Sequence, residues 1–144
     1  MAKYSSGIFV PKNPSKYAGN RHPTYRSSWE YAFMSFADNN PSVLSWASES
    51  IKIPYRNPLT GKQSIYVPDF FVMYVDKNGK KHSELIEVKP LKETMLTEKS
   101  SKRDKLSIAI NHAKWEMAAK WCRMKNIKFR VVNEGDIFHT GKKK

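Results

Sequence analysis

The segment Val67–Pro90 constrains the fold of this chain more than any other part of the sequence. Two stretches rich in β-branched and aromatic residues flank Asn78-Gly79, a dipeptide that accepts positive φ at both corners of a type I′ turn. Pro68 stands at the entry of the first stretch, where a missing backbone N–H does little harm to a sheet. The segment is therefore predicted to form a β-hairpin.

Charged residues lie at the open end of this hairpin. Asp69 belongs to its first strand, whereas Glu87, Val88 and Lys89 belong to its second. Because side chains alternate along a strand, Glu87 and Lys89 share one face and Val88 points to the other. Pairing of the strands can bring Asp69 level with them. Two carboxylates and an amine would then converge, which suits a hard divalent cation and a phosphate.

The same residues also fit an ordinary solvated strand face, because a short Pro-Asp and Glu-x-Lys pattern occurs by chance. However, Phe70–Val75 and Leu85-Ile86 are mostly apolar, as is typical of strands buried on both faces. Acidic groups on a buried strand cost free energy unless they are paired or bind a metal. This burial favours a functional site over a solvated face.

Length and composition bound the class of protein. A chain of 144 residues, with 40% hydrophobic and 12% aromatic residues, is expected to form one domain with a real core. Neither a signal peptide nor a membrane span is expected, since no apolar run is long enough. The single Cys122 excludes an internal disulfide and fits a reducing cytosol. The four histidines are scattered without cysteine partners, so a structural zinc site is not expected.

The net charge points to a polyanionic partner. Lysine and arginine number 26 against 13 acidic residues, which gives +13 and a pI near 9.8. Nucleic acid is the first expectation, and a solvated basic surface or a membrane-facing patch is the alternative. No basic amphipathic helix supports the membrane version. The stretch after Pro90 is expected to be a mobile basic loop beside the site, with DNA contacts from Lys99, Lys102, Arg103 and Lys105.

Residues 1–22 are basic and rich in turn residues, so they are expected to form an arm, laid along DNA or simply solvated. Lys3, Lys12, Lys16, Arg21 and Arg26 would suit phosphate contacts. The compact domain is expected to span residues 23–138, and residues 139–144 form a basic tail.

Hydrophobic periodicity predicts the remaining elements of a mixed α/β (α+β) fold. A helix is expected at about Tyr25–Ala37, with a core stripe of Tyr25, Trp29, Ala32 and Phe36, and Ser27-x-x-Glu30 has the form of a capping box. Strands near Ile51–Tyr55 and Ser64–Val75 and the second hairpin strand make three antiparallel strands. A second helix at about Asp104–Asn126 precedes a last strand, Ile127–Val132. The second helix is expected to bury a stripe of Leu106, Ile110, Ala113, Met117, Trp121 and Met124.

The chain resembles the PD-(D/E)xK nuclease superfamily in two ways: the element order is helix, three strands, helix and strand, and Pro-Asp and Glu-x-Lys lie on the second and third strands. This resemblance implies a restriction-endonuclease-like core, with a mixed central sheet flanked by helices. The likeness extends to head completion nucleases of T-even-type tailed phages, which are themselves similar to a transposon-end endonuclease subunit. It covers about Thr24 to Phe138. The residues that carry it are Tyr25–Glu30, Trp46–Glu49, Ile53–Tyr55, Val67–Phe70, Glu87–Pro90, Asn111, Lys114 and Trp115.

This resemblance implies roles for individual residues. It makes Asp69 and Glu87 metal ligands, with the backbone carbonyl of Val88 as a further ligand, and Lys89 the catalytic lysine. Glu30 matches the first-helix acid that completes the metal site, although its capping-box position gives it an ordinary structural alternative. The implied cofactor is Mg²⁺ or Mn²⁺. Asn111 and Lys114 are implied to lie near the scissile phosphate, and Lys114 could instead cover the core with its aliphatic stem.

The resulting expectation is a Mg²⁺-dependent DNA endonuclease that acts in phage head completion after packaging. A non-catalytic DNA-binding connector and a junction resolvase are the alternatives. The main expected partner is double-stranded DNA, recognised either without sequence preference or by its structure. Phage head or portal proteins and a second copy of the chain are further expected partners, and no membrane is expected. The expected location is the host cytoplasm, with the virion as a further site. Strand polarity, substrate preference and the number of metal ions stay open.

Overall fold

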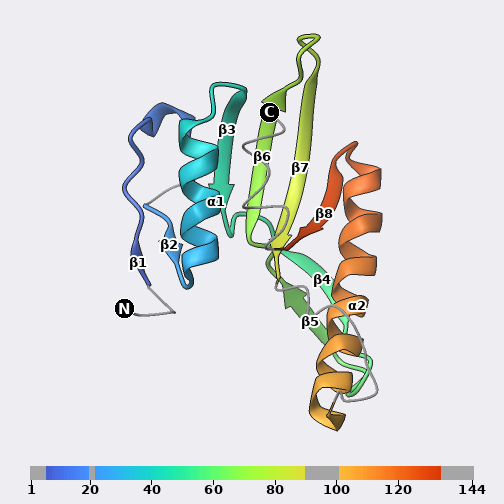
Figure 1. Ribbon diagram of the computed structural model, residues 1–144. Helices are drawn as coiled ribbons and strands as arrows, with labels where there is room; N and C mark the ends of the chain where they lie inside the picture. The colour runs from blue at the N-terminus through green and yellow to red at the C-terminus, as the bar shows by residue number, and fades with distance from the viewer. Residues whose placement is uncertain (1–5, 20–21, 90–100, 134–144) are drawn as a thin grey trace.

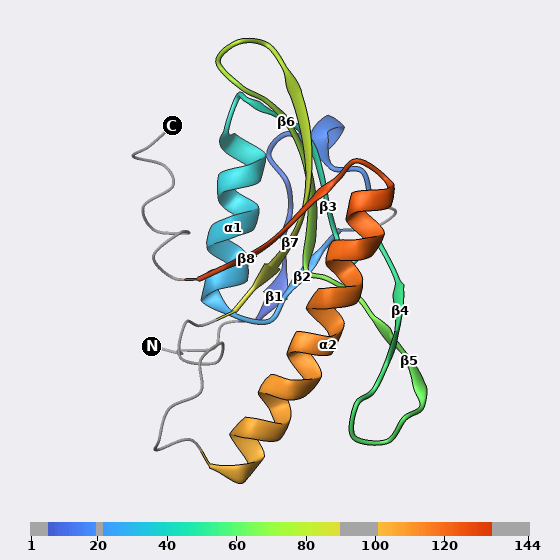
Figure 2. The same cartoon turned by 90° about the vertical axis from the view of Figure 1, so that its right-hand side faces the viewer.

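The computed structural model describes residues 6–19, 22–89 and 101–133, and its centre is a four-stranded mixed sheet (Figure 1). The strand order is β3 (Val43–Ser48), β6 (Phe70–Val75), β7 (Lys81–Val88) and β8 (Lys128–Val132). The first three strands are antiparallel, and β8 runs parallel to β7. Helices α1 (Ser28–Asn39) and α2 (Lys102–Met124) lie on opposite faces of this sheet (Figures 1 and 2). The expected α+β core, consistent with a restriction-endonuclease-like fold, is confirmed.

The central hairpin forms as predicted, but its turn is of a different type. Strands β6 and β7 pair from Phe70 opposite Ile86 to Val75 opposite Lys81. Gly79 has a φ of 81°, whereas Asn78 is not among the residues with positive φ. The turn closes through the N–H of Gly79, which donates to the carbonyl of Asp76 at 2.9 Å. The type I′ prediction is therefore wrong, because only one of the two residues takes the left-handed conformation.

The first strand of the core was placed too late in the sequence. Val43–Ser48 forms β3 and pairs with β6, whereas Ile53–Arg56 forms β4 in a separate hairpin with β5 (Gln63–Tyr66). Trp46 of β3 is fully buried, which ties this strand to the core. The expected strand Ser64–Val75 is interrupted between β5 and β6, where Pro68 supplies no N–H for a ladder. The β4–β5 hairpin is thus an insertion between two neighbouring core strands.

The stripes expected on the two helices face the core in part, but the most deeply buried positions are different ones. Helix α1 begins at Ser28 behind its N-cap Ser27, as the capping box predicts, and buries Phe33, Met34 and Ala37. Tyr25 falls outside the helix, in the short strand β2 (Thr24–Tyr25), yet Tyr25 and Trp29 of the expected stripe both pack against the hydrophobic cluster that contains these buried residues.

Helix α2 buries Ile108, Ala118 and Cys122. Four members of the expected stripe pack against the cluster that contains Ala118 and Cys122, namely Ile110, Ala113, Met117 and Trp121, while Leu106 and Met124 are exposed. The small side chains of Ala118 and Cys122 let the helix approach the sheet closely. Asn126 has a φ of 61°, and the next residue, Ile127, donates its N–H to the carbonyl of Cys122 at 2.8 Å. This is a Schellman-type ending, in agreement with the expected cap at Asn126.

The last strand contributes side chains to both faces of the sheet. Ile127 and Phe129 pack on the α2 side, whereas Val132 is buried among the residues on the α1 side.

Much of the expected N-terminal arm is part of the core. Strand β1 (Gly7–Ile8) pairs with β2, Phe9 is only 5% exposed, and a 3-10 turn, η1 (Pro14–Lys16), follows. The Nζ of Lys16 donates to the carbonyls of Asp38 and Asn40 at the end of α1, so it neutralises that helix terminus. Asp38 of α1 is fully buried, and its carboxylate accepts hydrogen bonds from the backbone N–H groups of residues 12 and 13. It thereby attaches this N-terminal segment to α1.

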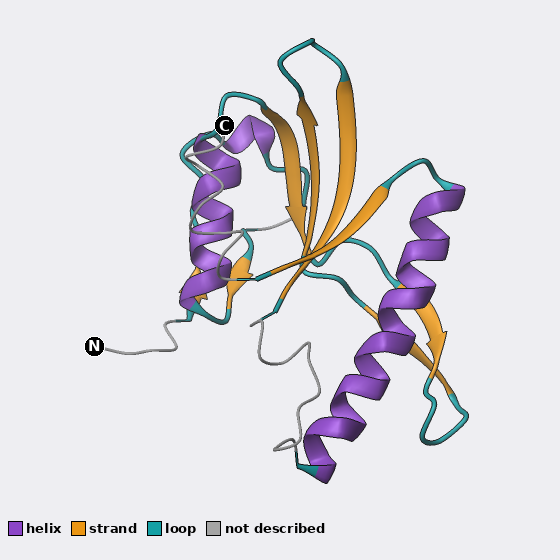
Figure 3. Cartoon of the chain, turned by 45° about the vertical axis from the view of Figure 1, so that its right-hand side comes forward, coloured by secondary structure: helices purple, strands orange, loops and turns teal. Residues whose placement is uncertain are grey.

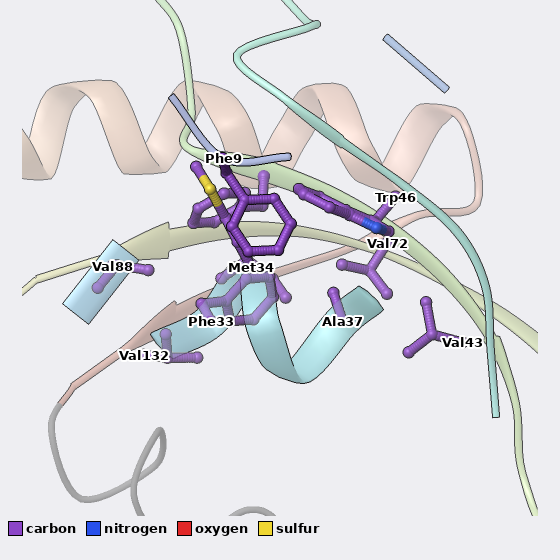
Figure 4. Packing of buried hydrophobic residues seen from close by; sticks show 11 residues of the cluster. Phe9, Phe33, Met34, Ala37, Val43, Trp46, Val72, Val88 and Val132 are labelled. Atoms are coloured by element: carbon purple, nitrogen blue, oxygen red, sulfur yellow. The ribbon is translucent and has the colours of Figure 1, made fainter. Parts of the chain in front are cut away.

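Two hydrophobic clusters lie on the two faces of the sheet. The first joins α1, β3 and β6 with Phe9 and Val132 (Figure 4). The second joins α2 to the β4–β5 hairpin and to Leu85 of β7. The insertion is therefore packed into the α2 side of the molecule. No helix in the described ranges combines the length and apolar character needed to cross a bilayer.

Candidate active site

Asp69 stands at the point where the β6–β7 ladder ends. It directly precedes β6, and its Oδ2 accepts a hydrogen bond of 2.8 Å from the N–H of Val88. The backbone of Asp69 is held as well, since its carbonyl accepts from the N–H of Glu49 at 2.9 Å. The carboxylate is thus anchored at the end of β7, level with Glu87.

Glu87 faces the same end of the sheet and is only 9% exposed. Its Oε1 accepts a hydrogen bond of 2.8 Å from the hydroxyl of Tyr66, on β5. Its Oε2 lies 4.0 Å from the Nζ of Lys89. Val88, which lies between Glu87 and Lys89 in the sequence, is buried in the hydrophobic cluster on the α1 side of the sheet. The alternation predicted for Glu87, Val88 and Lys89 is confirmed, and Asp69, Glu87 and Lys89 converge.

The two carboxylates disturb each other's ionisation. Burial and the charge of Glu87 raise the pKa of Asp69 to about 8, opposed by the N–H of Val88 and the charge of Lys89. Burial also raises the pKa of Glu87, although the Tyr66 hydroxyl, Lys89 and Lys114 act in the opposite direction. Burial and Glu87 raise the pKa of Tyr66, so this phenol stays protonated and donates. A cation between the acids would relieve their repulsion.

Glu30 makes the hydrogen bonds of a helix cap. Its N–H donates to the Oγ of Ser27 at 3.1 Å, and its Oε1 accepts from the N–H of Arg26 at 2.9 Å. Its charge nevertheless contributes to the raised pKa of Asp69, which places it in the neighbourhood of the site. The structural alternative for Glu30 is therefore present, and its role in metal binding stays a prediction.

The donor set suits a hard cation with few protein ligands. In residues 6–19, 22–89 and 101–133, no three His, Cys, Asp or Glu side chains gather closely enough to hold an ion. Asp69 and Glu87 form a pair, in which Oδ2 of Asp69 accepts from the N–H of Val88 and Oε1 of Glu87 accepts from the Tyr66 hydroxyl. Mg²⁺ keeps several waters and often takes only one or two carboxylates, so this pair fits it.

Lys114 lies close to this pair from the α2 side. Its Nζ is 5.8 Å from the ring centroid of Tyr55 and 5.7 Å from that of Tyr66. The ammonium therefore sits over two buried aromatic rings, and its charge acts on Glu87. Asn111 is half-buried one turn earlier on the same helix. The position of Lys114 over two rings of the α2-side cluster also agrees with the alternative that this residue covers the core.

Arg26 is an exposed residue in the neighbourhood of the acids. It forms a two-pronged ion pair with Glu49, and this pair raises the pKa of Arg26, helped by the charges of Glu30 and Asp69. Glu49 has a φ of 49°, an uncommon conformation for a residue other than glycine.

Part of the basic stretch that was expected to be a loop belongs to helix α2, which begins at Lys102. Lys102, Arg103 and Lys105, named here the basic turn, are exposed on the first turn of α2. Figure 3 shows these first turns extending beyond the sheet. The basic turn lies nine to twelve residues from Lys114, about 14–18 Å along the helix. Lys99 lies outside the described residues.

Two comparisons with known proteins identify the family. Residues 40–134 match the family described as TnsA-like endonuclease N terminal. The chain is also 37% identical over 147 aligned positions to the head completion nuclease of Enterobacteria phage T4, covering 94% of this chain and 95% of that protein. This chain belongs to that nuclease family. The match to the TnsA-like endonuclease family includes β3, the inserted hairpin, Asp69, Glu87, Lys89 and Lys114.

Sequence reasoning missed two residues of this site. Tyr66 reaches it from the inserted hairpin through its hydrogen bond to Glu87, and Glu49 reaches it through its contacts with Arg26 and Asp69. Tyr55, on the same hairpin, lies under the ammonium of Lys114. Glu49 stands within a stretch that resembles the nucleases, so a signal for it was present. For Tyr66 no local signal existed, because its hydrogen-bond partner, Glu87, is 21 residues away in the chain.

Proposed function

We propose that this protein is a Mg²⁺-dependent DNA endonuclease that acts in completing phage heads after DNA packaging. The observation that carries the proposal is the convergence of Asp69, Glu87 and Lys89 at one end of the sheet in a member of an endonuclease family. The name of the T4 relative supplies the biological setting. The host cytoplasm, and later the virion, are the places where such a protein would act.

Three groups would hold the ion: the carboxylates of Asp69 and Glu87 and the carbonyl of Val88. Glu30, from α1, would add its charge nearby, as it does in the raised pKa of Asp69. When bound, Mg²⁺ supplies an activated water and neutralises charge on the pentavalent phosphorus, and Mn²⁺ can replace it. The apolar strands around these residues keep the acids from being fully hydrated. This environment favours binding of a cation over leaving two repelling carboxylates unpaired.

Lys89 would act on the phosphate itself. Its ammonium lies beside Oε2 of Glu87 and is 27% exposed, so an incoming phosphate oxygen can reach it. A positive charge fixed there stabilises the extra negative charge of the transition state. We therefore assign Lys89 to transition-state stabilisation.

DNA would be held by several separate contacts. Lys114 acts on Glu87, and Asn111 lies one turn before it on α2. Arg26 can exchange its exposed partner Glu49 for a phosphate, since exposed ion pairs contribute little. Successive phosphates of one strand are about 3.4 Å apart along the DNA axis, so the basic turn would reach the backbone about four or five nucleotides from Lys114. Such contacts favour binding without sequence preference.

The test is incubation of the purified protein with linear, nicked and branched DNA, in Mg²⁺ or in chelator. Cleavage in Mg²⁺ alone is expected, and Asp69→Asn and Glu87→Gln should abolish it. Glu116→Gln, an exposed acid of α2, is the matched control and should cut at the wild-type rate. Wild-type activity in Asp69→Asn would refute the assignment.

The same experiment separates the alternatives. Binding without cleavage of any substrate would indicate a non-catalytic connector, and cleavage confined to branched DNA would indicate a junction resolvase. Cutting of both strands from one active site requires two copies or two events. Sedimentation with and without DNA therefore tests the proposed dimer.

A further inference from the structure

The hydrogen bond between Tyr66 and Glu87 gives the two carboxylate oxygens of Glu87 different surroundings. Oε1 accepts from the Tyr66 hydroxyl at 2.8 Å in a buried position, while Oε2 lies 4.0 Å from the Nζ of Lys89. A carboxylate without such a partner can rotate and offer both oxygens to an ion. In this structure Oε1 faces the phenol and Oε2 faces Lys89, and the backbone of Asp69 also hydrogen-bonds the carboxylate.

Tyr66 is itself held rigidly. It is 5% exposed and lies on β5, opposite Ile53 of β4, within the cluster that joins the inserted hairpin to α2. Its ring and that of Tyr55 share the ammonium of Lys114, at 5.7 Å and 5.8 Å from their centroids. Since the donor is fixed by burial and by a cation–π contact, its hydroxyl can orient a neighbouring acid.

We propose that Tyr66 is a positioning residue that makes Glu87 a one-oxygen ligand, and that the inserted β4–β5 hairpin serves to bring this phenol to the end of the core sheet. This inference rests on the proposed metal-dependent nuclease function and adds a determinant of metal choice. Mg²⁺ and Mn²⁺ accept one oxygen per carboxylate in compact octahedral sites, whereas Ca²⁺ readily takes both. The phenol therefore selects for the smaller ions.

The test measures metal binding without DNA or turnover. Mn²⁺ binding is followed by electron paramagnetic resonance, and Ca²⁺ binding by competition with Mn²⁺, for wild type, Tyr66→Phe and Tyr55→Phe. The control is closely matched, because Tyr55 is equally buried on the same hairpin and keeps its ring under Lys114. We expect Tyr66→Phe to bind Mn²⁺ roughly tenfold more weakly and to lose much less Ca²⁺ affinity. Tyr55→Phe should bind both ions within about twofold of wild type.

Three results would overturn the inference. The first is unchanged Mn²⁺ binding by Tyr66→Phe in a wild type that binds Mn²⁺ and cleaves DNA, which would leave the proposed function standing. The second is a proportionate loss of Mn²⁺ and Ca²⁺ affinity, which indicates general loosening of the site and not a change in the orientation of Glu87. The third is a wild type that neither binds Mn²⁺ nor cuts, which would refute the nuclease proposal as well. Melting curves in chelator confirm that each variant is folded.

Discussion

Replacing Asp69 with asparagine should stabilise the metal-free protein while destroying the proposed activity. Burial and the charge of Glu87 raise the pKa of Asp69 from 3.8 to about 8. Asparagine has nearly the same shape, can still accept the hydrogen bond from the N–H of Val88, and carries no charge. The variant therefore removes the electrostatic cost and keeps the local structure.

The sign and size follow from proton linkage. Because the pKa of Asp69 is higher in the folded state, folding takes up a proton between pH 4 and pH 8, and the wild type loses stability as pH rises through this range. Each pKa unit corresponds to about 1.36 kcal/mol, so the cost at pH 7 is about 4 kcal/mol. For a domain of this size this is about 10 °C in melting temperature.

The assay is thermal unfolding in chelator from pH 4 to pH 9. The advantage of Asp69→Asn over wild type should be small near pH 4, grow to pH 8 and then level off. Adding Mg²⁺ at pH 8 should raise the melting temperature of wild type and leave Asp69→Asn nearly unchanged. Glu116→Gln controls for the loss of an acid as such. An Asp69→Asn protein that melts below wild type at pH 8 would refute the reasoning.

Three further outcomes are expected from variants of the charged residues. Lys89→Ala should bind DNA and Mn²⁺ nearly as wild type yet cut far more slowly, in single-turnover assays, because its charge acts on the transition state; weaker binding with normal turnover would make it an ordinary phosphate contact. Glu30→Gln keeps the bond to the N–H of Arg26, so a metal role predicts lost cleavage at an unchanged melting temperature, whereas Ser27→Ala should lower stability by about 1 kcal/mol through the lost cap. If Glu30→Gln cuts normally, Glu30 is only a cap. Alanine at the three positions of the basic turn should flatten the slope of log K against log salt by up to about 2.7, measured by fluorescence anisotropy; an unchanged slope would place the DNA elsewhere.

Local patterns in the sequence determined the central hairpin and its acidic end. Alternation within Glu87–Lys89 and the turn residues of the hairpin act over a few positions, so they could be interpreted without any tertiary contact. The start of α1 is equally local, because Ser27 and Glu30 form the cap within one turn. These features place Asp69, Glu87 and Lys89 at one end of the sheet.

Only the tertiary structure decided which segments form the core strands and which face of each helix is buried. Val43–Ser48 joins the core because Trp46 packs against α1 and β6, while Ile53–Arg56 is drawn into a hairpin under α2. The most deeply buried positions of both helices depend on the surfaces that the helices meet, so helical periodicity alone found only part of each buried face. Tyr66 reaches Glu87 from the inserted hairpin, and Lys114 reaches both tyrosines from α2. Such contacts join residues far apart in the chain, and no local pattern encodes them.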